Sequence, residues 1–348
     1  MPPAAGGRRR AVAPLTPAAA GPPDCRLRVV GGLDMPGAAR RAYGERGDRR
    51  RGEEPPMPVV ESPLRGRTAV VTGAARGLGA AVARELSLRG ARVALLGREE
   101  RTLARVAETL PGDCACWEVD VTDDRGLARV GEDIRVRLGA PSVVVANAGV
   151  AEGGPFAESD PEVWRRVIEV NLVGSAATAR TFLGDLFATS GYFLQVASLA
   201  SIGAAPMMSA YCASKAGVES FAHALRAEVA HRRVGVGIAY INWTDTDMVR
   251  DVDRYAVLRE LRGHMPPPAR RVFPAAYVAG RLVTAIERRR PTVYVPRWLR
   301  SAQLVRAALP AVVTMVSRRE LPRLAAVHPF EPTGLLGAGG RAASRPRG

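Results

Sequence analysis

The chain has 348 residues, 47% of them hydrophobic and 24% charged, and its net charge of +16 comes almost wholly from arginine, because Lys215 is the single lysine. This is the composition of a globular protein; the arginines cluster in the flanks and no nucleic-acid-binding module is recognisable, so we expect no nucleic acid partner. The four cysteines are too few and too scattered for a disulfide framework or a metal site, which favours a cytoplasmic protein.

Residues 1–63 form a segment rich in Pro, Gly, Ala and Arg without apolar periodicity. Such a segment cannot bury enough surface to offset the entropy of ordering, so we expect a disordered arm. Its start imitates a secretory signal, but Pro14 and Pro17 interrupt the apolar stretch. Met57, just before the region that we expect to fold, is a candidate for the true start.

Short apolar runs alternate with helical periods over residues 64–296. The predicted strands are 68–72, 92–96, 115–119, 142–146, 192–196, 234–241 and 292–295, and the predicted helices are 78–89, 101–110, 125–138, 161–187, 209–232 and 275–288. This alternation is typical of a parallel sheet with helices on both faces. We therefore expect an α/β fold, a doubly wound Rossmann-type sheet of about seven strands in a single domain. Residues 248–273 interrupt the alternation and are expected to form a lid or substrate loop.

The C-terminal part is predicted to be an amphipathic helical extension over residues 297–333 and a disordered tail over residues 334–348. An apolar stripe at helical spacing has arginines beside it, and consists of Trp298, Ala302, Val305, Leu309, Val312 and Val316. The stripe could touch an anionic membrane surface peripherally, or it could pack against the catalytic domain or a second subunit. No apolar run approaches the ~20 residues that span a bilayer.

A glycine-rich turn joins the first predicted strand to the first helix, with the sequence Thr72-Gly73-Ala74-Ala75-Arg76-Gly77-Leu78-Gly79. Glycine lets the backbone turn tightly and approach a pyrophosphate, whose charge the helix N-terminus then meets. Such turns are common, so the motif alone is a weak signal. Here the strand before it and the helix after it supply the required context.

The end of the second predicted strand bears on the choice of cofactor. Enzymes specific for NAD usually carry a carboxylate there, which binds the adenosine ribose hydroxyls. This chain has Gly97 followed by Arg98. With no carboxylate to repel a 2′-phosphate, and with Arg98 and Arg76 as donors, NADP is favoured. The alternative is that both are solvated surface arginines.

Tyr211 and Lys215 are four residues apart in a predicted helix and therefore share one face. A tyrosine and a lysine often fall at this spacing by chance, but chance is a weaker explanation here because Lys215 is the only lysine of the chain. Ser198 follows the fifth predicted strand, thirteen residues before Tyr211, with Ser201 as its rival. Asn171 lies on the helix predicted over residues 161–187, where a buried, helix-bending amide is the alternative interpretation.

The GxxxGxG spacing of the glycines, the turn Asn147-Ala148-Gly149 and the YxxxK pair together resemble the short-chain dehydrogenase/reductase (SDR) family, over about residues 67–296. The resemblance implies an NADP(H)-dependent oxidoreductase that moves a hydride between nicotinamide and a carbonyl or secondary alcohol. It implies a homo-oligomer, dimer or tetramer, with a small-molecule substrate. The catalytic residues that it implies are Asn171, Ser198, Tyr211 and Lys215. The cofactor contacts that it implies are Gly73, Arg76, Gly77, Leu78, Gly79, Arg98, Asp120, Val121, Asn147, Ala148, Gly149, Tyr211, Lys215 and Thr246.

The chemistry explains these residue types. Hydride transfer to a carbonyl builds charge on oxygen, so Ser198 and Tyr211 should donate hydrogen bonds there and Tyr211 should deliver the proton. Lys215 is expected to lower the pKa of the phenol and to hold the nicotinamide ribose, and Asn171 to position a water. The run Ala204-Ala205-Pro206-Met207-Met208, beside the predicted lid, indicates an apolar substrate pocket, although methionines there could also be core filler.

One departure from the family pattern follows the sixth predicted strand. Ile241-Asn242 stands where the family normally has Pro-Gly, which puts the geometry of the loop before Thr246 in question. Two alternatives follow. A catalytically silent NADP-binding scaffold protein would be expected to have lost the tyrosine or the lysine, and both remain. An SDR-type epimerase or dehydratase would usually show GxxGxxG and a larger C-terminal domain, and neither is present.

Overall fold

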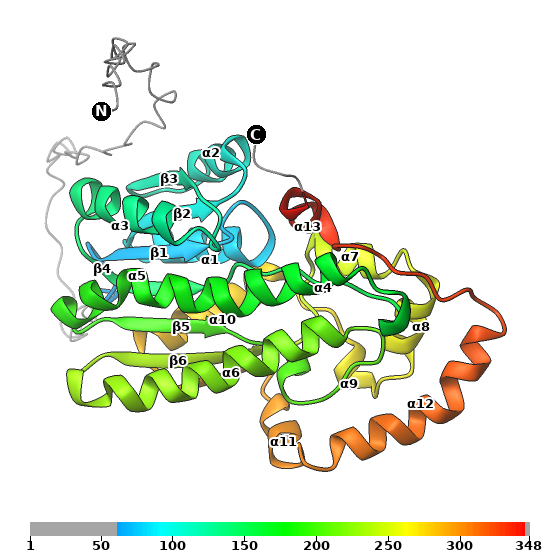
Figure 1. The fold of residues 1–348 in the computed structure, drawn as a ribbon. Helices are drawn as coiled ribbons and strands as arrows, with labels where there is room; N and C mark the ends of the chain where they lie inside the picture. The colour runs from blue at the N-terminus through cyan, green and yellow to red at the C-terminus, as the bar shows by residue number, and fades with distance from the viewer. Residues whose placement is uncertain (1–60, 345–348) are drawn as a thin grey trace, which may run out of the picture.

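The computed structural model of the protein describes residues 61–344, so that almost all of the arm predicted over residues 1–63 lies outside the described residues (Figure 1). All pairings in the central sheet are parallel, and the strand order is β3-β2-β1-β4-β5-β6-β7. The strands are β1 (Thr68–Thr72), β2 (Arg92–Gly97), β3 (Cys114–Glu118), β4 (Pro141–Ala146), β5 (Tyr192–Val196), β6 (Gly235–Ile241) and β7 (Thr292–Val295). The predicted doubly wound, Rossmann-type α/β fold is confirmed.

Helices cover both faces of the sheet (Figure 1). One face carries α1 (Gly77–Leu88), α2 (Glu100–Glu108) and α10 (Ala275–Glu287), and the other carries α3 (Asp124–Leu138), α5 (Gly174–Thr189) and α6 (Ser209–Val229). Because successive strand residues point to opposite faces, Val71 packs into the first hydrophobic cluster and its neighbour Val70 into the second. The strands are buried from both sides, which explains their continuous apolar runs.

The helix predicted over residues 161–187 is interrupted. It consists of α4 (Pro161–Ile168), a π-helical segment (Glu169–Val173) and then α5. Single π-helical turns within helices are frequent at functional sites. Asn171 lies in this segment and is 1% exposed.

Residues 248–273, predicted as a lid or substrate loop, are mostly helical. They contain the end of α7 (Asp247–Val252), then α8 (Ala256–Gly263) and α9 (Pro267–Arg270). Each of these helices has eight residues or fewer, so the sequence offers too few helical periods to reveal them. Beyond β7 the predicted helical extension is present as α11 (Leu299–Leu304) and α12 (Leu309–Ala325). No helix in residues 61–344 is both long and apolar enough to cross a bilayer.

The structure differs from the disordered tail predicted over residues 334–348. Gly337–Ala343 form a short helix, α13, that packs against α7 (Figure 1). The backbone N–H of Gly337 donates to Asp251 Oδ2 (2.8 Å), Arg341 pairs with Asp251, and the N–H of Leu336 donates to the carbonyl of Ala151 (2.8 Å). These partners are distant in sequence, which is why composition alone misses the ordered tail. Residues 345–348 lie outside the described range.

Candidate active site

One cavity of about 610 Å³ lies at the carboxyl edge of the sheet and brings together residues that follow β1 to β6. The strand order reverses between β1 and β4, and in open α/β sheets ligands bind in the crevice at this reversal. The glycine turn lines one part of the cavity, and Ser198, Tyr211 and Lys215 line another. Elements that are distant in sequence therefore meet where a dinucleotide is expected.

The glycine turn has a backbone that other residues could not adopt. Gly73 and Gly77 have φ values of +65° and +55°, and a Cβ on Gly79 would lie 2.1 Å from the Gly73 carbonyl oxygen. A Cβ on Gly77 would lie 3.0 Å from Thr246 Cγ2, so the predicted contact Thr246 lies directly against the turn. The turn leaves its backbone open at the N-terminus of α1, and this fits a cofactor pyrophosphate.

Asn147 braces the sheet as the resemblance implies. Its Nδ2 donates to the carbonyl of Thr72 (3.0 Å), and the backbone N–H groups of Asn147 and Ala148 donate to Thr72 Oγ1 (3.1 Å each). These bonds join the end of β1 to the end of β4. Ala148 and Gly149 line the cavity beside them.

The predicted donors to a 2′-phosphate are both paired with carboxylates. Arg76 pairs with Glu99, and Arg98 Nε lies 3.3 Å from Asp120 Oδ2. Glu99 lines the cavity two residues after β2, and the sequence analysis missed it as a possible partner of the adenosine ribose. Its position two residues beyond the strand end was the available signal.

Asp120 is 7% exposed and also pairs with Arg166 on α4. Burial by itself would raise the pKa of Asp120, but hydrogen bonds from Thr122 and Arg166 outweigh it and lower that pKa. Asp120 is therefore a charged anchor that holds two arginines at the predicted adenine end. Val121 follows it along the cavity wall.

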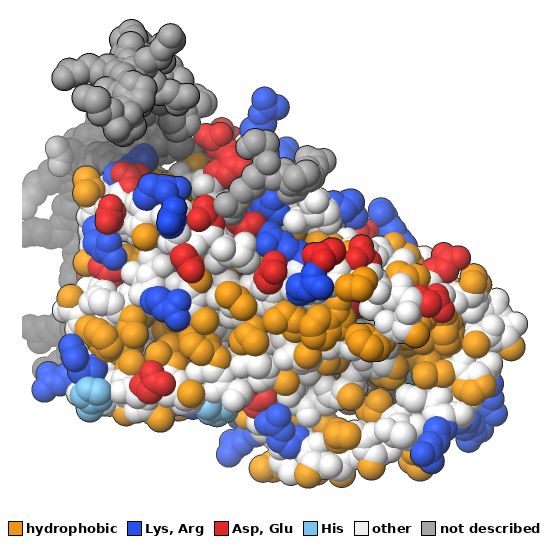
Figure 2. All heavy atoms as spheres, viewed as in Figure 1, with side chains coloured by type: hydrophobic (Ala, Val, Ile, Leu, Met, Phe, Trp, Pro, Cys, Tyr) orange, Lys and Arg blue, Asp and Glu red, His pale blue; other side chains and the backbone are white. Residues whose placement is uncertain are grey.

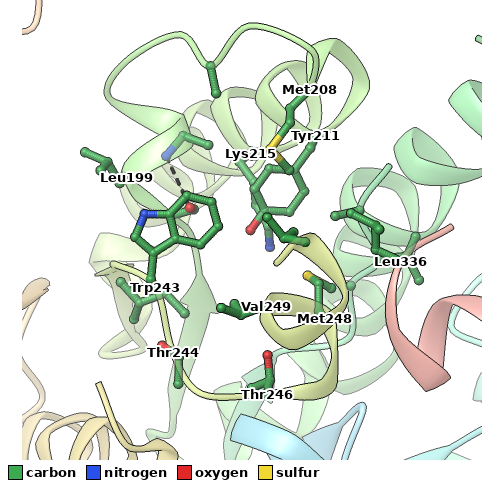
Figure 3. Close-up of a pocket in the computed structure, with 18 of the residues that line it drawn as sticks. Leu199, Met208, Tyr211, Lys215, Trp243, Thr244, Thr246, Met248, Val249 and Leu336 are labelled. Carbon is green, nitrogen blue, oxygen red and sulfur yellow. Dashed lines mark hydrogen bonds between the residues drawn. The ribbon is translucent and has the colours of Figure 1, made fainter. Parts of the chain in front are cut away.

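Ser198, Tyr211 and Lys215 line the same cavity, and Figure 3 shows Tyr211 and Lys215 next to each other. Ser198 lies beside the Tyr211 phenol, and its Oγ accepts from the backbone N–H of Ala200 (3.2 Å). Lys215 Nζ lies 5.7 Å from the centroid of the Tyr211 ring and donates to the carbonyl of Val196 (3.2 Å). The two α6 side chains point the same way, as their spacing predicts.

Ser201, the rival of Ser198, has a structural position. It is 4% exposed, its Oγ donates to the carbonyl of Lys215 (2.8 Å), and it accepts from the backbone N–H of Ser198 (3.3 Å). Ser201 does not line the cavity, whereas Ser198 does. The geometry therefore favours Ser198 as the reacting hydroxyl.

The side chain of Asn171 is bonded entirely to protein. Its Oδ1 accepts from the N–H of Val150 (2.8 Å), and its Nδ2 donates to the carbonyl of Val150 (2.9 Å) and to Ser214 Oγ (2.9 Å). It does not line the cavity. Asn171 thus ties the loop after β4 to the helix of Tyr211. Both atoms of its side-chain amide already have protein partners, so the structure gives no support for the predicted water-holding role.

Burial dominates the titration of the reacting pair. It raises the pKa of Tyr211 above its ordinary value, with the hydrogen bond from Ser198 acting in the opposite direction. It lowers the pKa of Lys215 to about 8. We expected Lys215 to lower the pKa of Tyr211, but in this arrangement the desolvation of the phenol prevails.

Comparison with known proteins identifies the family. The family model described as short chain dehydrogenase matches residues 67–256. The chain belongs to this family. It is 35% identical over 222 residues to cis-4-hydroxycyclohexanecarboxylate dehydrogenase of Sinomonas cyclohexanicum, which covers 61% of this chain and 89% of that protein.

Two further relatives agree with this assignment. The chain is 32% identical over 207 residues to the 3-oxoacyl-[acyl-carrier-protein] reductase FabG of Pseudomonas aeruginosa, covering 58% of this chain and 83% of that one. The crystal structure of a short chain dehydrogenase/reductase from Burkholderia phymatum in complex with NAD is similar with a TM-score of 0.63 and 25% identity, and it covers 70% of this chain and 94% of the other. Short chain dehydrogenases are oxidoreductases that bind a nicotinamide cofactor.

The loop after β6 departs from the short chain dehydrogenase pattern, and the structure shows what the replacement does. The Nδ2 of Asn242 donates to the carbonyls of Ala269 (3.0 Å) and Arg271 (3.3 Å), which ties this loop to the end of the lid. Neither proline nor glycine has a side-chain donor for such bonds. Thr246 remains against Gly77, so the loop still reaches the glycine turn.

Glu152 is a buried carboxylate that no local sequence motif marks. Its Oε1 accepts from the backbone N–H of Ala210 (2.9 Å) in the first turn of α6, where a negative charge is favourable. Burial raises its pKa, and the backbone N–H groups of Ala210 and Tyr211 oppose that rise. Glu152 therefore helps to fix the start of the helix that carries Tyr211 and Lys215, the predicted catalytic pair.

The cavity wall on the substrate side is mainly apolar (Figure 3). Met208 lies on the same side as Tyr211, and Trp243 stands opposite with Leu199 beside it. Val249 and Met248 of α7 close the space below. The predicted apolar pocket is thus formed by the catalytic turn and the lid together.

Proposed function

We propose that this short chain dehydrogenase is an NADP(H)-dependent oxidoreductase that moves a hydride between nicotinamide and the carbonyl or secondary alcohol of an apolar substrate. The observation that carries the proposal is that the Ser198 hydroxyl, the Tyr211 phenol and the Lys215 ammonium line the same cavity as the glycine turn. When bound, the nicotinamide supplies or accepts the hydride. The turn and Asn147-Ala148-Gly149 would hold its adenosine and pyrophosphate portions.

The residues of the chain handle the proton. In reduction, Ser198 and Tyr211 donate hydrogen bonds to the substrate oxygen as charge builds on it, and Tyr211 gives up its proton. Because burial raises the pKa of Tyr211, the phenol holds its proton at neutral pH, which suits this direction. In oxidation the Tyr211 phenolate, stabilised by the Lys215 ammonium, accepts the proton of the substrate alcohol. Asn171 acts through Ser214 and Val150 as a positioning residue.

A reductase assay tests the function. We would follow the absorbance of reduced nicotinamide over a panel of aldehydes, ketones and oxo esters, with an alcohol panel for the reverse direction. Net cofactor oxidation that depends on a carbonyl compound supports the proposal. A catalytically silent scaffold would bind NADPH but would not oxidise it with any compound of the panel. An epimerase or dehydratase would change its substrate without net oxidation of the cofactor.

We propose a preference for NADP(H) over NAD(H) of about 10- to 100-fold in kcat/KM, since one charged hydrogen bond to the 2′-phosphate is worth about 1.5–3 kcal/mol. Arg98 supports this, because its pairing with Asp120 holds it at the cavity wall. Arg98→Ala should reduce the preference at least fivefold. Arg101→Ala is the matched control, because Arg101 is exposed and does not line the cavity. Equal kcat/KM for both cofactors in the wild type would favour Glu99 as a ligand of the NAD ribose.

We further propose a cytoplasmic homo-oligomer. Figure 2 shows apolar side chains gathered over α5 and between α5 and α6, a face on which a second copy could pack. Val173, directly before α5, is 52% exposed, and Leu183 of α5 and Phe221 of α6 are partly buried. The number of subunits stays a prediction.

We also propose that the outer face of the C-terminal extension contacts an anionic membrane surface peripherally. Trp298, Ala302 and Leu309 pack against the core, as the second alternative for the apolar stripe expects. Leu304 and Val305, however, are 83% and 54% exposed. Basic residues contribute about 1 kcal/mol each near an anionic surface.

We therefore expect the full-length protein to sediment with phosphatidylserine vesicles at low salt. The double variant Leu304→Ser/Val305→Ser should sediment less, and vesicles of phosphatidylcholine alone serve as the control. Protein that stays in the supernatant with anionic vesicles would rule membrane contact out.

A further inference from the structure

The apolar half of the cavity does not end at the catalytic residues but continues to the C-terminal extension, outside residues 67–256 that the family model matches. From α11 and α12 the cavity is lined by Ala302, Leu309, Val312, Val313 and Val316. From the lid it is lined by Leu258, Leu261, Met265, Pro266 and Ala269. We call the space between these two sets the α12 slot.

The α12 slot is open apolar surface rather than packed core. Val312 and Val316 line the cavity and yet remain 47% and 42% exposed. Figure 1 shows α12 standing away from the sheet, beyond α9. Apolar surface left open on an inner wall gains free energy when an apolar group covers it.

The position of α12 is fixed at both ends by polar contacts. Before it, Arg306 pairs with Glu219, which is 3% exposed, lies on α6 and also accepts from Gln303 Nε2 (3.1 Å). Near its C-terminal end, Glu320 lies 3.4 Å from His264 Nε2, at the end of α8. These two contacts therefore fix the position of α12 relative to α6 and to the lid.

The contact at Arg306 also connects the slot to the reacting groups. Arg306 Nη2 donates to the carbonyl of Ser201 (3.1 Å) and Nη1 to Glu219 Oε1 (2.7 Å). Ser201 in turn contacts the backbone of Ser198 and of Lys215. The wall of the slot is thus anchored to the turn and the helix that carry the catalytic side chains.

We infer that the substrate of this enzyme carries an extended apolar chain, that the chain lies in the α12 slot with its carbonyl or hydroxyl at Tyr211, and that α12 determines which chain lengths are accepted. The inference rests on the proposed function. The observation that supports it is that residues of α12 line the same cavity as Tyr211. A membrane surface or a second copy of the chain would meet the outer face of α12 and would not reach the catalytic end.

The test uses the full-length enzyme with NADPH and a series of 2-alkanones from 2-butanone to 2-dodecanone. We expect kcat/KM to rise about threefold to fourfold for each methylene that becomes buried, and then to level off. Val313→Trp, which fills the slot, should shift the levelling to shorter chains and lower kcat/KM for 2-dodecanone at least tenfold, while 2-butanone changes less than twofold. Ala311→Trp is the control, since Ala311 is exposed on α12, does not line the cavity and lies about 200° around the helix from Val313.

Calorimetric titration of the same ketones into the protein saturated with NADP distinguishes binding in the α12 slot from the proposed reductase activity. If affinity rises with chain length but no ketone is reduced, the slot stands and the proposed function fails. If ketones are reduced with kcat/KM independent of chain length, or if Val313→Trp and Ala311→Trp have the same profile as the wild type, the inference is overturned. Equal losses in both tryptophan variants would also overturn it, because they would show that bulk anywhere on α12 matters.

Discussion

Tyr211→Phe is expected to lower kcat by about 10²- to 10⁴-fold, the contribution typical of a positioned general acid. The substitution removes the phenol oxygen and leaves the ring, which packs in the apolar cluster around Ala210 and Val170. Affinity for NADPH should stay within a few fold, because the proton matters chiefly in the transition state. Single-turnover reduction of an accepted ketone, with NADPH titration by fluorescence, measures both quantities.

Tyr277→Phe is the matched control for this experiment. Tyr277 lies on α10, is 49% exposed and does not line the cavity, so that loss of its hydroxyl should leave kcat unchanged. If Tyr211→Phe kept most of the wild-type kcat, another group would have to be the acid. Ser198 would then be the first candidate, because its hydroxyl lines the same cavity as the phenol.

Lys215→Met is expected to make the enzyme inactive and more stable at once. Burial lowers the pKa of Lys215 from 10.5 to about 8, so that the folded protein disfavours the ammonium form that the unfolded chain prefers. At about 1.4 kcal/mol per pKa unit the penalty near pH 7 reaches about 3 kcal/mol. Methionine has a similar length and no charge, so the free energy of unfolding should rise by about 1–3 kcal/mol. The rise is smaller than the full penalty because the carbonyl of Val196 loses its hydrogen-bond donor.

The pH dependence identifies the cause of that gain. Between pH 8 and 10.5 the unfolded chain binds a proton at this lysine and the folded protein does not, so the stability of the wild type rises with pH over this window. The advantage of Lys215→Met should therefore be full below pH 8 and should vanish as the pH approaches 10.5. Urea unfolding without cofactor at several pH values measures it. A constant difference across the window would mean that packing, not charge burial, separates the two proteins.

Patterns that are local in sequence predicted most of the fold. The strands are continuous apolar runs because both faces of the sheet are covered, and a run such as Thr68–Thr72 is legible without knowledge of its partners. The glycine turn and the pair of Tyr211 and Lys215 are equally local, since a left-handed backbone and a shared helix face are set within a few residues. The cavity brings these motifs together, as their places after the strands predict.

Features that depend on distant partners could not be read in this way. The tail helix α13 is held by Asp251, and its sequence of mainly glycine and alanine does not predict that contact. The position of Asn171 within a π-helical turn depends on Val150 and Ser214, which lie on two other segments. The pKa of Tyr211 was expected to be lowered by its neighbouring lysine before the cost of desolvation is subtracted, and the size of that cost depends on a burial that only the tertiary structure shows.

The buried lysine has a practical consequence for chemical labelling. Lys215 is the only side-chain amine in the chain, and with a pKa of about 8 it is present in part as the nucleophilic free amine near neutral pH. A side chain acylated by an amine-directed reagent must therefore be this one, and the reagent must enter the cavity to reach it. The extent of a single modification, read as a mass increase on one peptide, thus reports how often the active site is open and how fully a bound ligand covers it.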